Sequence, residues 1–127
     1  MKLNPTREWI SIALITVIGV DHLLLMRGEY DEAHYLGMLF VANFFGAIVA
    51  AVGIYRGSLW GWLLGLAIAV GSLIGYVLSR TVGMPGMEVE AWLQPAGILS
   101  LLAEAAFILL VVLIEPWKRE ERNVAND

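Results

Sequence analysis

Hydrophobic residues gather in four long blocks along the chain, and short polar segments separate the blocks. The blocks cover about residues 9–26, 35–55, 59–78 and 96–114. A helix rises about 1.5 Å per residue, so about 20 apolar residues cross the hydrocarbon layer of a bilayer. Backbone groups in lipid must form hydrogen bonds within their own segment, and the blocks lack the two-residue alternation of barrel strands. The pattern therefore predicts four membrane-spanning helices.

The connections between the blocks indicate how the helices are arranged. Only Arg56, Gly57 and Ser58 lie between the second and third blocks, so these two helices must be antiparallel neighbours. The chain of 127 residues has room for one domain. We therefore expect a single membrane domain over residues 1–127. It is an all-α, integral membrane, antiparallel four-helix bundle in the lipid bilayer, with a charged C-terminal tail over residues 115–127.

The composition supports a membrane protein and excludes several functions. Hydrophobic residues make up 59% of the chain and charged residues 16%, whereas soluble domains are about half apolar and about a quarter charged. The chain has no cysteine, which excludes disulfides, thiolate metal sites and thiol redox chemistry. Its net charge of −4 provides no basic surface, so no nucleic-acid partner is expected. No nucleophile–base pair stands at a suggestive spacing, so a hydrolase is not favoured.

Lysine and arginine residues predict the orientation of the bundle. The termini and the second connection contain Lys2, Arg7, Arg56, Lys118, Arg119 and Arg122. The first and third connections contain only Arg27 and Arg80. Short cytoplasmic loops carry the excess of basic residues, so both termini are expected in the cytoplasm.

Polar and ionisable residues inside the predicted spans lie mostly in the outer half of the bundle. Such side chains are costly in lipid and need either partners or a function. All four helices contribute at least one, so we expect a polar pocket that opens outward. The candidate pocket and ligand-binding residues are Glu104, His22, Asp21, Asn43, Arg80, Ser72 and Ser100. We expect Arg80, where the third helix leaves the membrane, to anchor that helix by snorkelling to the interface.

Glu104 is the single carboxylate near the middle of the membrane. Ser100 stands four residues before it, on the same face of the predicted fourth helix. The candidate partners of Glu104 are His22, Arg80 and Asn43. Its carboxyl group could relay protons, bind a cation or hold a substrate amine; alternatively, it forms a hydrogen bond that locks two helices together. We favour a functional role, because a neutral residue would lock helices at lower cost.

His22, His34 and Asp21 form a second candidate set, since imidazole and carboxylate groups can bind a divalent metal ion. Two histidines on adjacent helices could also be axial ligands of a haem. The spacing of these residues matches no established metal motif, so the sequence identifies no cofactor.

Glycines predict how the third helix packs and how its connection to the fourth helix folds. Gly61 with Gly65, and Gly71 with Gly75, have the spacing of closely packed membrane helices. The packing partner can be another helix of the bundle, a partner protein or a second copy of the chain. The segment 79–87 contains turn residues and methionines, and we expect it to fold back as a lid over the pocket.

Motifs along most of the chain resemble a group of bacterial proteins. These motifs are His22-Leu23 at the end of the first block, Gly37-Met38-Leu39-Phe40 at the start of the second, and Ser79-Arg80-Thr81-Val82-Gly83-Met84-Pro85-Gly86 before a fourth block with Glu104. Together they resemble a family of small bacterial four-span membrane proteins of uncharacterised function. The resemblance extends from His22 to Glu104. It implies a multi-pass protein of the bacterial plasma (inner) membrane and supplies no activity.

Three functional hypotheses follow from the sequence. We favour a small accessory or assembly subunit of a larger membrane complex, because the soluble portion is minimal and no catalytic motif is present. The second hypothesis is a carrier or channel for a proton or cation that uses Glu104, His22 and Asn43. The third is a metal- or haem-binding membrane protein. Another membrane protein, or a second copy of the chain, is an expected partner.

Overall fold

The computed structural model describes residues 4–127, and this part of the chain folds into helices without any strand. The helices are α1 (Pro5–Glu32), α2 (His34–Tyr55), α3 (Leu59–Thr81), α4 (Pro95–Ile114) and α5 (Pro116–Asn126). Within the described residues, four helical segments are long and apolar enough to cross a membrane. The predicted all-α, four-helix membrane architecture is therefore confirmed. Lys2, which contributes to the predicted basic excess at the termini, lies outside the described residues.

Helix α1 is longer at both ends than the hydrophobic pattern predicts. Its start is capped by Asn4, whose side-chain oxygen accepts a hydrogen bond from the Thr6 N–H at 3.0 Å. Pro5 follows at the first helical position, where its missing N–H costs nothing. At the other end α1 continues to Glu32, and only Ala33 separates it from α2. Glu29, Asp31 and Glu32, which lie between the first two predicted blocks, therefore belong to the last part of α1.

The charged C-terminal tail forms helix α5 after a sharp turn. Glu115 lies in the left-handed region with φ 50°, and Pro116 begins α5. The guanidinium group of Arg119 donates a hydrogen bond of 3.0 Å to the carbonyl oxygen of Gly57. This contact ties α5 to the turn between α2 and α3.

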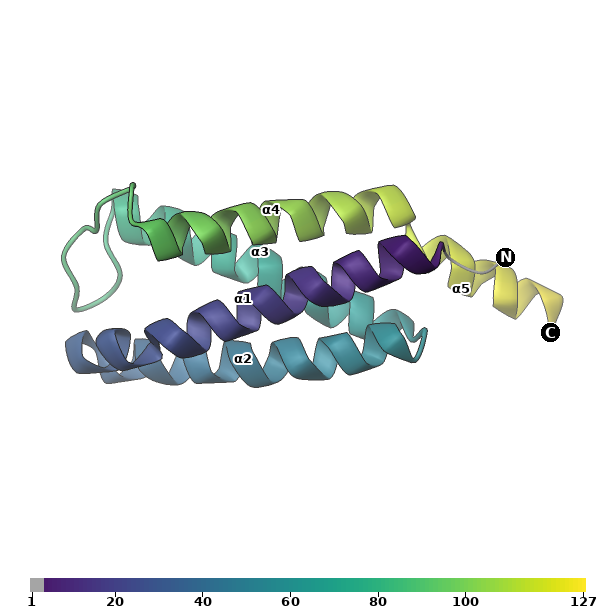
Figure 1. The fold of residues 1–127 in the computed structure, drawn as a ribbon, viewed down its shortest axis with the longest axis horizontal. Coiled ribbons are helices and arrows are strands. Elements are labelled where there is room, and N and C mark those ends of the chain that lie inside the picture. Colours follow the sequence, from purple (N-terminus) through teal and green to yellow (C-terminus); the bar gives the residue numbers. More distant parts are fainter. Residues whose placement is uncertain (1–3) are drawn as a thin grey trace.

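Helices α1 to α4 form an antiparallel bundle in which each helix packs against two others (Figure 1). Helix α1 packs against α2 and α4, and α3 packs against the same two helices. Both ends of the chain lie at one end of the bundle, and the α1–α2 and α3–α4 connections lie at the other (Figure 1). We call the half nearer the chain ends the proximal half and the half nearer those two connections the distal half.

The proximal half and the middle of the bundle are closely packed around an apolar core. Trp62 and Phe107 are fully buried there. A Cβ atom added to Gly53 would lie 2.7 Å from the Cα atom of Gly61, and one added to Gly65 would lie 2.7 Å from the Phe107 ring. The first glycine pair of α3 therefore packs closely, as predicted.

The second glycine pair of α3 does not pack against another helix of the bundle, so close packing within the bundle is absent at these two positions. Among the described residues, nothing lies within 4 Å of a Cβ atom added to Gly71 or Gly75. The distal parts of α3 and α4 lie apart from those of α1 and α2 (Figure 1). Both glycines line a pocket between these two pairs of helices.

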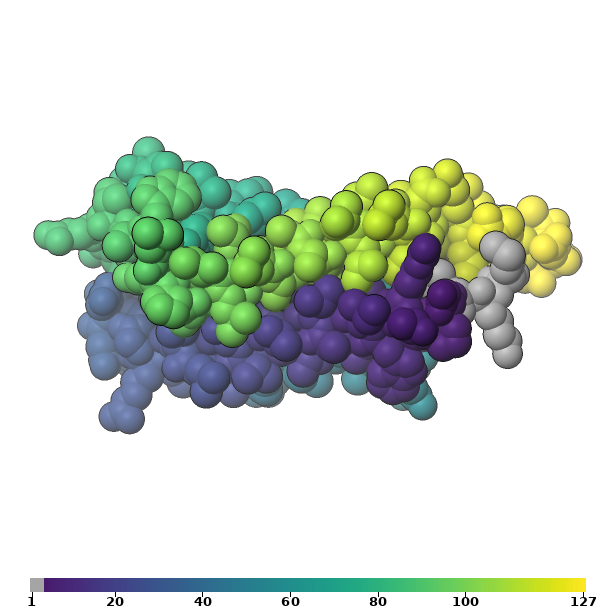
Figure 2. Space-filling model, turned by 45° about the horizontal axis from the view of Figure 1, so that its top comes forward, coloured from purple at the N-terminus to yellow at the C-terminus, as the bar shows by residue number. Residues whose placement is uncertain are grey.

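The outside of the bundle is rich in large hydrophobic side chains, as expected for a surface in contact with lipid. Exposed examples on three different helices are Leu24, Phe45 and Leu102. The space-filling view shows an elongated molecule, with the α3–α4 connection at its distal end beside the end of α1 (Figure 2). These features fit a multi-pass membrane protein.

Candidate functional site

A pocket of about 490 Å³ occupies the distal half of the bundle. Helices α1 to α4 and the α3–α4 connection all contribute side chains to its wall. Pockets that hold small ligands have volumes of about 300–1,000 Å³ and mostly apolar walls with a few polar groups. This pocket has that character, because leucine, phenylalanine and methionine side chains alternate with carboxyl, amide and hydroxyl groups along its wall.

Glu104 is the most deeply buried ionisable residue of the pocket, with only 1% of its surface exposed. Ser100 lies one turn earlier on α4, so the two side chains share a face of that helix. The Ser100 hydroxyl donates a hydrogen bond of 2.6 Å to one carboxyl oxygen of Glu104. The other oxygen, Oε2, has no hydrogen-bond partner in the described part of the chain. Glu104 therefore keeps one free acceptor in the pocket.

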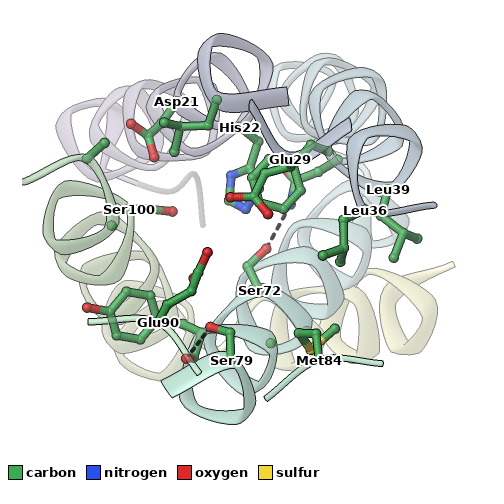
Figure 3. A pocket seen from close by; sticks show the side chains of 18 of the residues that line it. Asp21, His22, Glu29, Leu36, Leu39, Ser72, Ser79, Met84, Glu90 and Ser100 are labelled. Atoms are coloured by element: carbon green, nitrogen blue, oxygen red, sulfur yellow. Dashed lines mark hydrogen bonds between the residues drawn. The ribbon is translucent and has the colours of Figure 1, made fainter. Parts of the chain in front are cut away.

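Asp21 and His22 extend from α1 into the same pocket (Figure 3). Asp21 is 7% exposed, and its Oδ2 atom lacks a partner among the residues that the structure describes. The Nδ1 atom of His22 lies 2.8 Å from the carbonyl oxygen of Ile18. A carbonyl can only accept, so Nδ1 carries the proton of the neutral ring and Nε2 is left as an acceptor. The imidazole also packs against Phe40, with 4.8 Å between ring centroids.

Asn43 and Ser72 form a polar contact between α2 and α3. The Asn43 amide nitrogen donates a hydrogen bond of 2.7 Å to the Ser72 hydroxyl. The amide oxygen of Asn43 is buried and unpartnered within residues 4–127. The predicted partners of Glu104 were His22, Arg80 and Asn43, and none of the three forms a hydrogen bond to it in this structure. Their contribution is to line the same pocket.

Arg80 is buried inside the distal end of the bundle, so the expectation that it snorkels to the membrane interface is wrong. Its guanidinium group donates hydrogen bonds to Ser79 (2.6 Å), Glu90 (2.8 Å) and Gln94 (3.3 Å). Its Cζ atom lies 3.8 Å from the centre of the Tyr76 ring, in a cation–π contact. An arginine that extended to the membrane surface could not form these contacts. Arg80 instead holds the α3–α4 connection against α3.

The α3–α4 connection lies over the distal end of the pocket, as its composition predicts. Met84 and Met87 line the pocket. The Tyr35 hydroxyl of α2 donates a hydrogen bond of 2.6 Å to the Pro85 carbonyl oxygen, and the Tyr76 hydroxyl of α3 donates one of 2.6 Å to that of Trp92. The connection is therefore hydrogen-bonded to both α2 and α3.

The structure does not bring together His22, His34 and Asp21, the set expected to bind a metal ion or haem. His34 is exposed at the start of α2 and stacks on Tyr30, with 4.4 Å between ring centroids. It does not line the pocket that contains His22 and Asp21. In the described chain, no three His, Cys, Asp or Glu residues lie close enough to hold a metal ion. The three residues therefore do not form one site, because α1 extends past the point where the sequence pattern ends it and His34 begins α2 at the far end of that extension.

Sequence reasoning missed Tyr76 and Glu90 as pocket residues. Tyr76 is buried beside Arg80. The signal was present in the spacing of Ser72, Tyr76 and Arg80, which stand four residues apart and so share one face of α3. Glu90 carries no comparable signal, because it lies in an irregular segment.

The fold and the pocket define a small four-span helical membrane protein with a mostly apolar pocket at one end that contains several buried polar groups. No family model, curated protein or solved structure matches the chain. The function is therefore inferred from the geometry of the pocket.

Proposed function

We propose that this protein binds a small ligand that carries an amine in the distal pocket, with the pocket facing the outside of the cell. The observation that carries the proposal is the free acceptor on Glu104, which is 1% exposed. Asp21 and Asn43 add two further buried acceptors without partners in the described residues, and all three side chains line one pocket. A buried polar group without a partner costs about 1–3 kcal/mol. An ammonium group has three N–H donors and no acceptor, which complements this set.

The orientation in this proposal rests on the distribution of basic residues. Arg7, Arg56 and Arg119 belong to the proximal end of the structure, whereas Arg27 lies at the distal end. Arg80 is engaged with Glu90 inside the bundle. This excess of basic residues favours a cytoplasmic location for the proximal end. The distal pocket then opens away from the cytoplasm.

Thermal unfolding of the purified protein in a neutral detergent tests the proposal. The probes are propylamine, propanol and propionate, which have chains of the same length. We expect propylamine alone to raise the unfolding temperature, because a ligand at 100 times its Kd stabilises the folded state by about 2.7 kcal/mol. The stabilisation should be lost in Glu104→Gln and kept in Glu32→Gln, which removes an exposed carboxyl group outside the pocket.

Equal stabilisation of the wild type and Glu104→Gln by propylamine would contradict the proposal. So would an effect of propylamine no greater than that of propanol. If Glu104→Gln does not fold, Asp21→Asn provides a second test, because it also removes the charge of an unpartnered, pocket-lining carboxyl group.

A carrier that uses the same pocket is the second candidate function. The fully buried side chains of Ile54, Trp62 and Phe107 close the path from the pocket to the proximal end. Transport therefore requires that half of the bundle to open. The accessory-subunit hypothesis stays a prediction from the small polar portion of the chain, and the pocket supports it less directly than it supports ligand binding.

A further inference from the structure

Helices α2 and α3 touch in the proximal half and separate toward the distal end. Midway along the pair, the Ile68 side chain fills the space beside α2, with its Cδ1 atom 3.0 Å from a Cβ atom added to Gly46. Beyond that point, a Cβ atom added to Gly71 or Gly75 meets no neighbour within 4 Å among the described residues. A gap between α2 and α3 therefore begins after Ile68.

Two hydrogen bonds lie along this gap. One joins Asn43 to Ser72 at 2.7 Å, and the other joins Tyr35 to the carbonyl oxygen of Pro85 at 2.6 Å. Apart from these polar contacts, the pocket-lining residues on the two sides of the gap are mostly small or apolar. Small or apolar residues of α2 and α3 that line the pocket beside the gap include Leu39, Ala42, Gly71 and Gly75.

The gap opens to the lipid rather than to water. Leu39 is 55% exposed and Gly71 is exposed, yet both line the pocket. Gly71 lies ten residues before the end of α3 at Thr81, which places it about 15 Å from that end. The hydrocarbon layer is about 30 Å thick, so this opening lies near its middle. A molecule in the bilayer can therefore reach the pocket from the side.

The two ends of the pocket differ in chemistry. Leu39 and Met84 lie on one side of it, and Asp21 and Ser100 lie on the opposite side (Figure 3). The gap thus leads from apolar surroundings across the pocket to the carboxyl groups. A ligand that matches both ends has an apolar chain and a polar head.

The charges of the pocket decide which head group fits. Its wall contains five carboxylate residues and one guanidinium group. The carboxylate residues are Asp21, Glu29, Glu88, Glu90 and Glu104. The guanidinium group of Arg80 is already engaged by Glu90, Gln94 and Ser79. A phosphate would find no free cation here and would meet an excess of negative charge, whereas an amine would be attracted.

From this arrangement we infer that the ligand is an aliphatic amine without a phosphate, drawn from the bilayer through the gap between α2 and α3. Its amine lies at Glu104 and Asp21, and its chain leaves the pocket past Leu39 and Gly71. This inference rests on the proposed function and adds to it the class of ligand and the route of entry.

Photo-crosslinking of the protein in phosphatidylcholine nanodiscs tests the inference. The probe is decylamine with a diazirine at the end of its chain, and mass spectrometry locates the labelled residues. We expect labelling along the α2–α3 gap around Leu39 and Gly71. Gly71→Leu, which fills the opening, should reduce this labelling at least tenfold. Gly28→Leu is the matched control, because a Cβ atom on Gly28 also meets nothing within 4 Å of described structure and Gly28 does not line the pocket.

The short amine separates failure of the inference from failure of the proposed function. Stabilisation by propylamine in Gly71→Leu, with loss of decylamine labelling, supports the lateral route. Labelling that persists in Gly71→Leu overturns that route while the proposed function stands. Labelling that is unchanged in Glu104→Gln shows that the amine does not bind at the carboxyl groups and overturns the inference. If propylamine does not stabilise even the wild type, the proposed function fails and the inference fails with it.

Discussion

Arg80 attaches the α3–α4 connection to the bundle through a single side chain. Its guanidinium group reaches Glu90 and Gln94 of the connection by hydrogen bonds. The Cζ atom of the group lies over the Tyr76 ring, 3.8 Å from its centre. A planar fork with five N–H donors suits these partners, whereas an ammonium group is a point charge that cannot stack in the same way. The position of the connection over the pocket therefore depends on arginine rather than on positive charge alone.

Replacing Arg80 should loosen the connection and destabilise the protein. We expect Arg80→Met to lower the free energy of unfolding by about 2–3 kcal/mol, because it leaves the partly buried carboxylate of Glu90 without its partner. Arg80→Lys should have a smaller effect. The measurement is reversible unfolding in detergent. The control is Arg27→Met, which removes an exposed basic residue at the same end of the bundle, and a loss as large in this control would contradict the prediction.

The sequence predicts contacts within a helix better than contacts between helices. The bond between Ser100 and Glu104 follows from their four-residue spacing on α4. The bond between Asn43 and Ser72 joins two helices, and it depends on their relative rotation and depth, which the sequence does not specify. Arg80 was placed wrongly for the same reason, since its partners lie in an irregular segment whose path cannot be predicted from local pattern.

At the scale of helices, the two glycine pairs of α3 show that one spacing can have opposite consequences. Gly61 lies in close contact with the backbone of α2, whereas Gly75 faces the open pocket. The hydrophobic blocks predicted all four long helices, because each must satisfy its own backbone in lipid. The pattern could not predict where two helices separate, because that depends on the whole bundle and on the contacts that hold the α3–α4 connection.

Alanine substitutions at Gly61 and Gly75 should therefore have opposite effects on the stability of the protein. Gly61→Ala places a Cβ atom 2.6 Å from the backbone nitrogen of Ile54, so we expect a loss of stability of about 1–3 kcal/mol from overpacking. Gly75→Ala meets no described atom within 4 Å, so it should be neutral or stabilise by up to about 1 kcal/mol through helix propensity. Unfolding temperatures measured in one detergent compare the two variants. Equal losses of stability would show that the α2–α3 gap is closed in solution.

At the scale of the whole molecule, the bundle has two unlike ends. The proximal end carries both chain termini, the tight α2–α3 turn and the charged helix α5. The distal end carries the pocket and the α3–α4 connection. The start of α1 and helix α5 lie at the same end of the bundle, and the fold does not fix which side of the membrane that end faces. The orientation decides whether the pocket samples the outer or the cytoplasmic leaflet.

Cysteine labelling of intact cells determines this orientation, and the chain suits the method because it has no native cysteine. Single substitutions are made at three exposed positions, Asp31, Val82 and Val124. Asp31 lies at the distal end of α1, Val82 directly follows the distal end of α3, and Val124 lies in α5. Because basic residues favour a cytoplasmic proximal end, a membrane-impermeant maleimide should label Asp31→Cys and Val82→Cys in intact cells, and Val124→Cys only after the cells are opened. The reverse pattern would place the pocket on the cytoplasmic side. An amine would then be drawn from the inner leaflet, where anionic lipids attract cations and raise its local concentration.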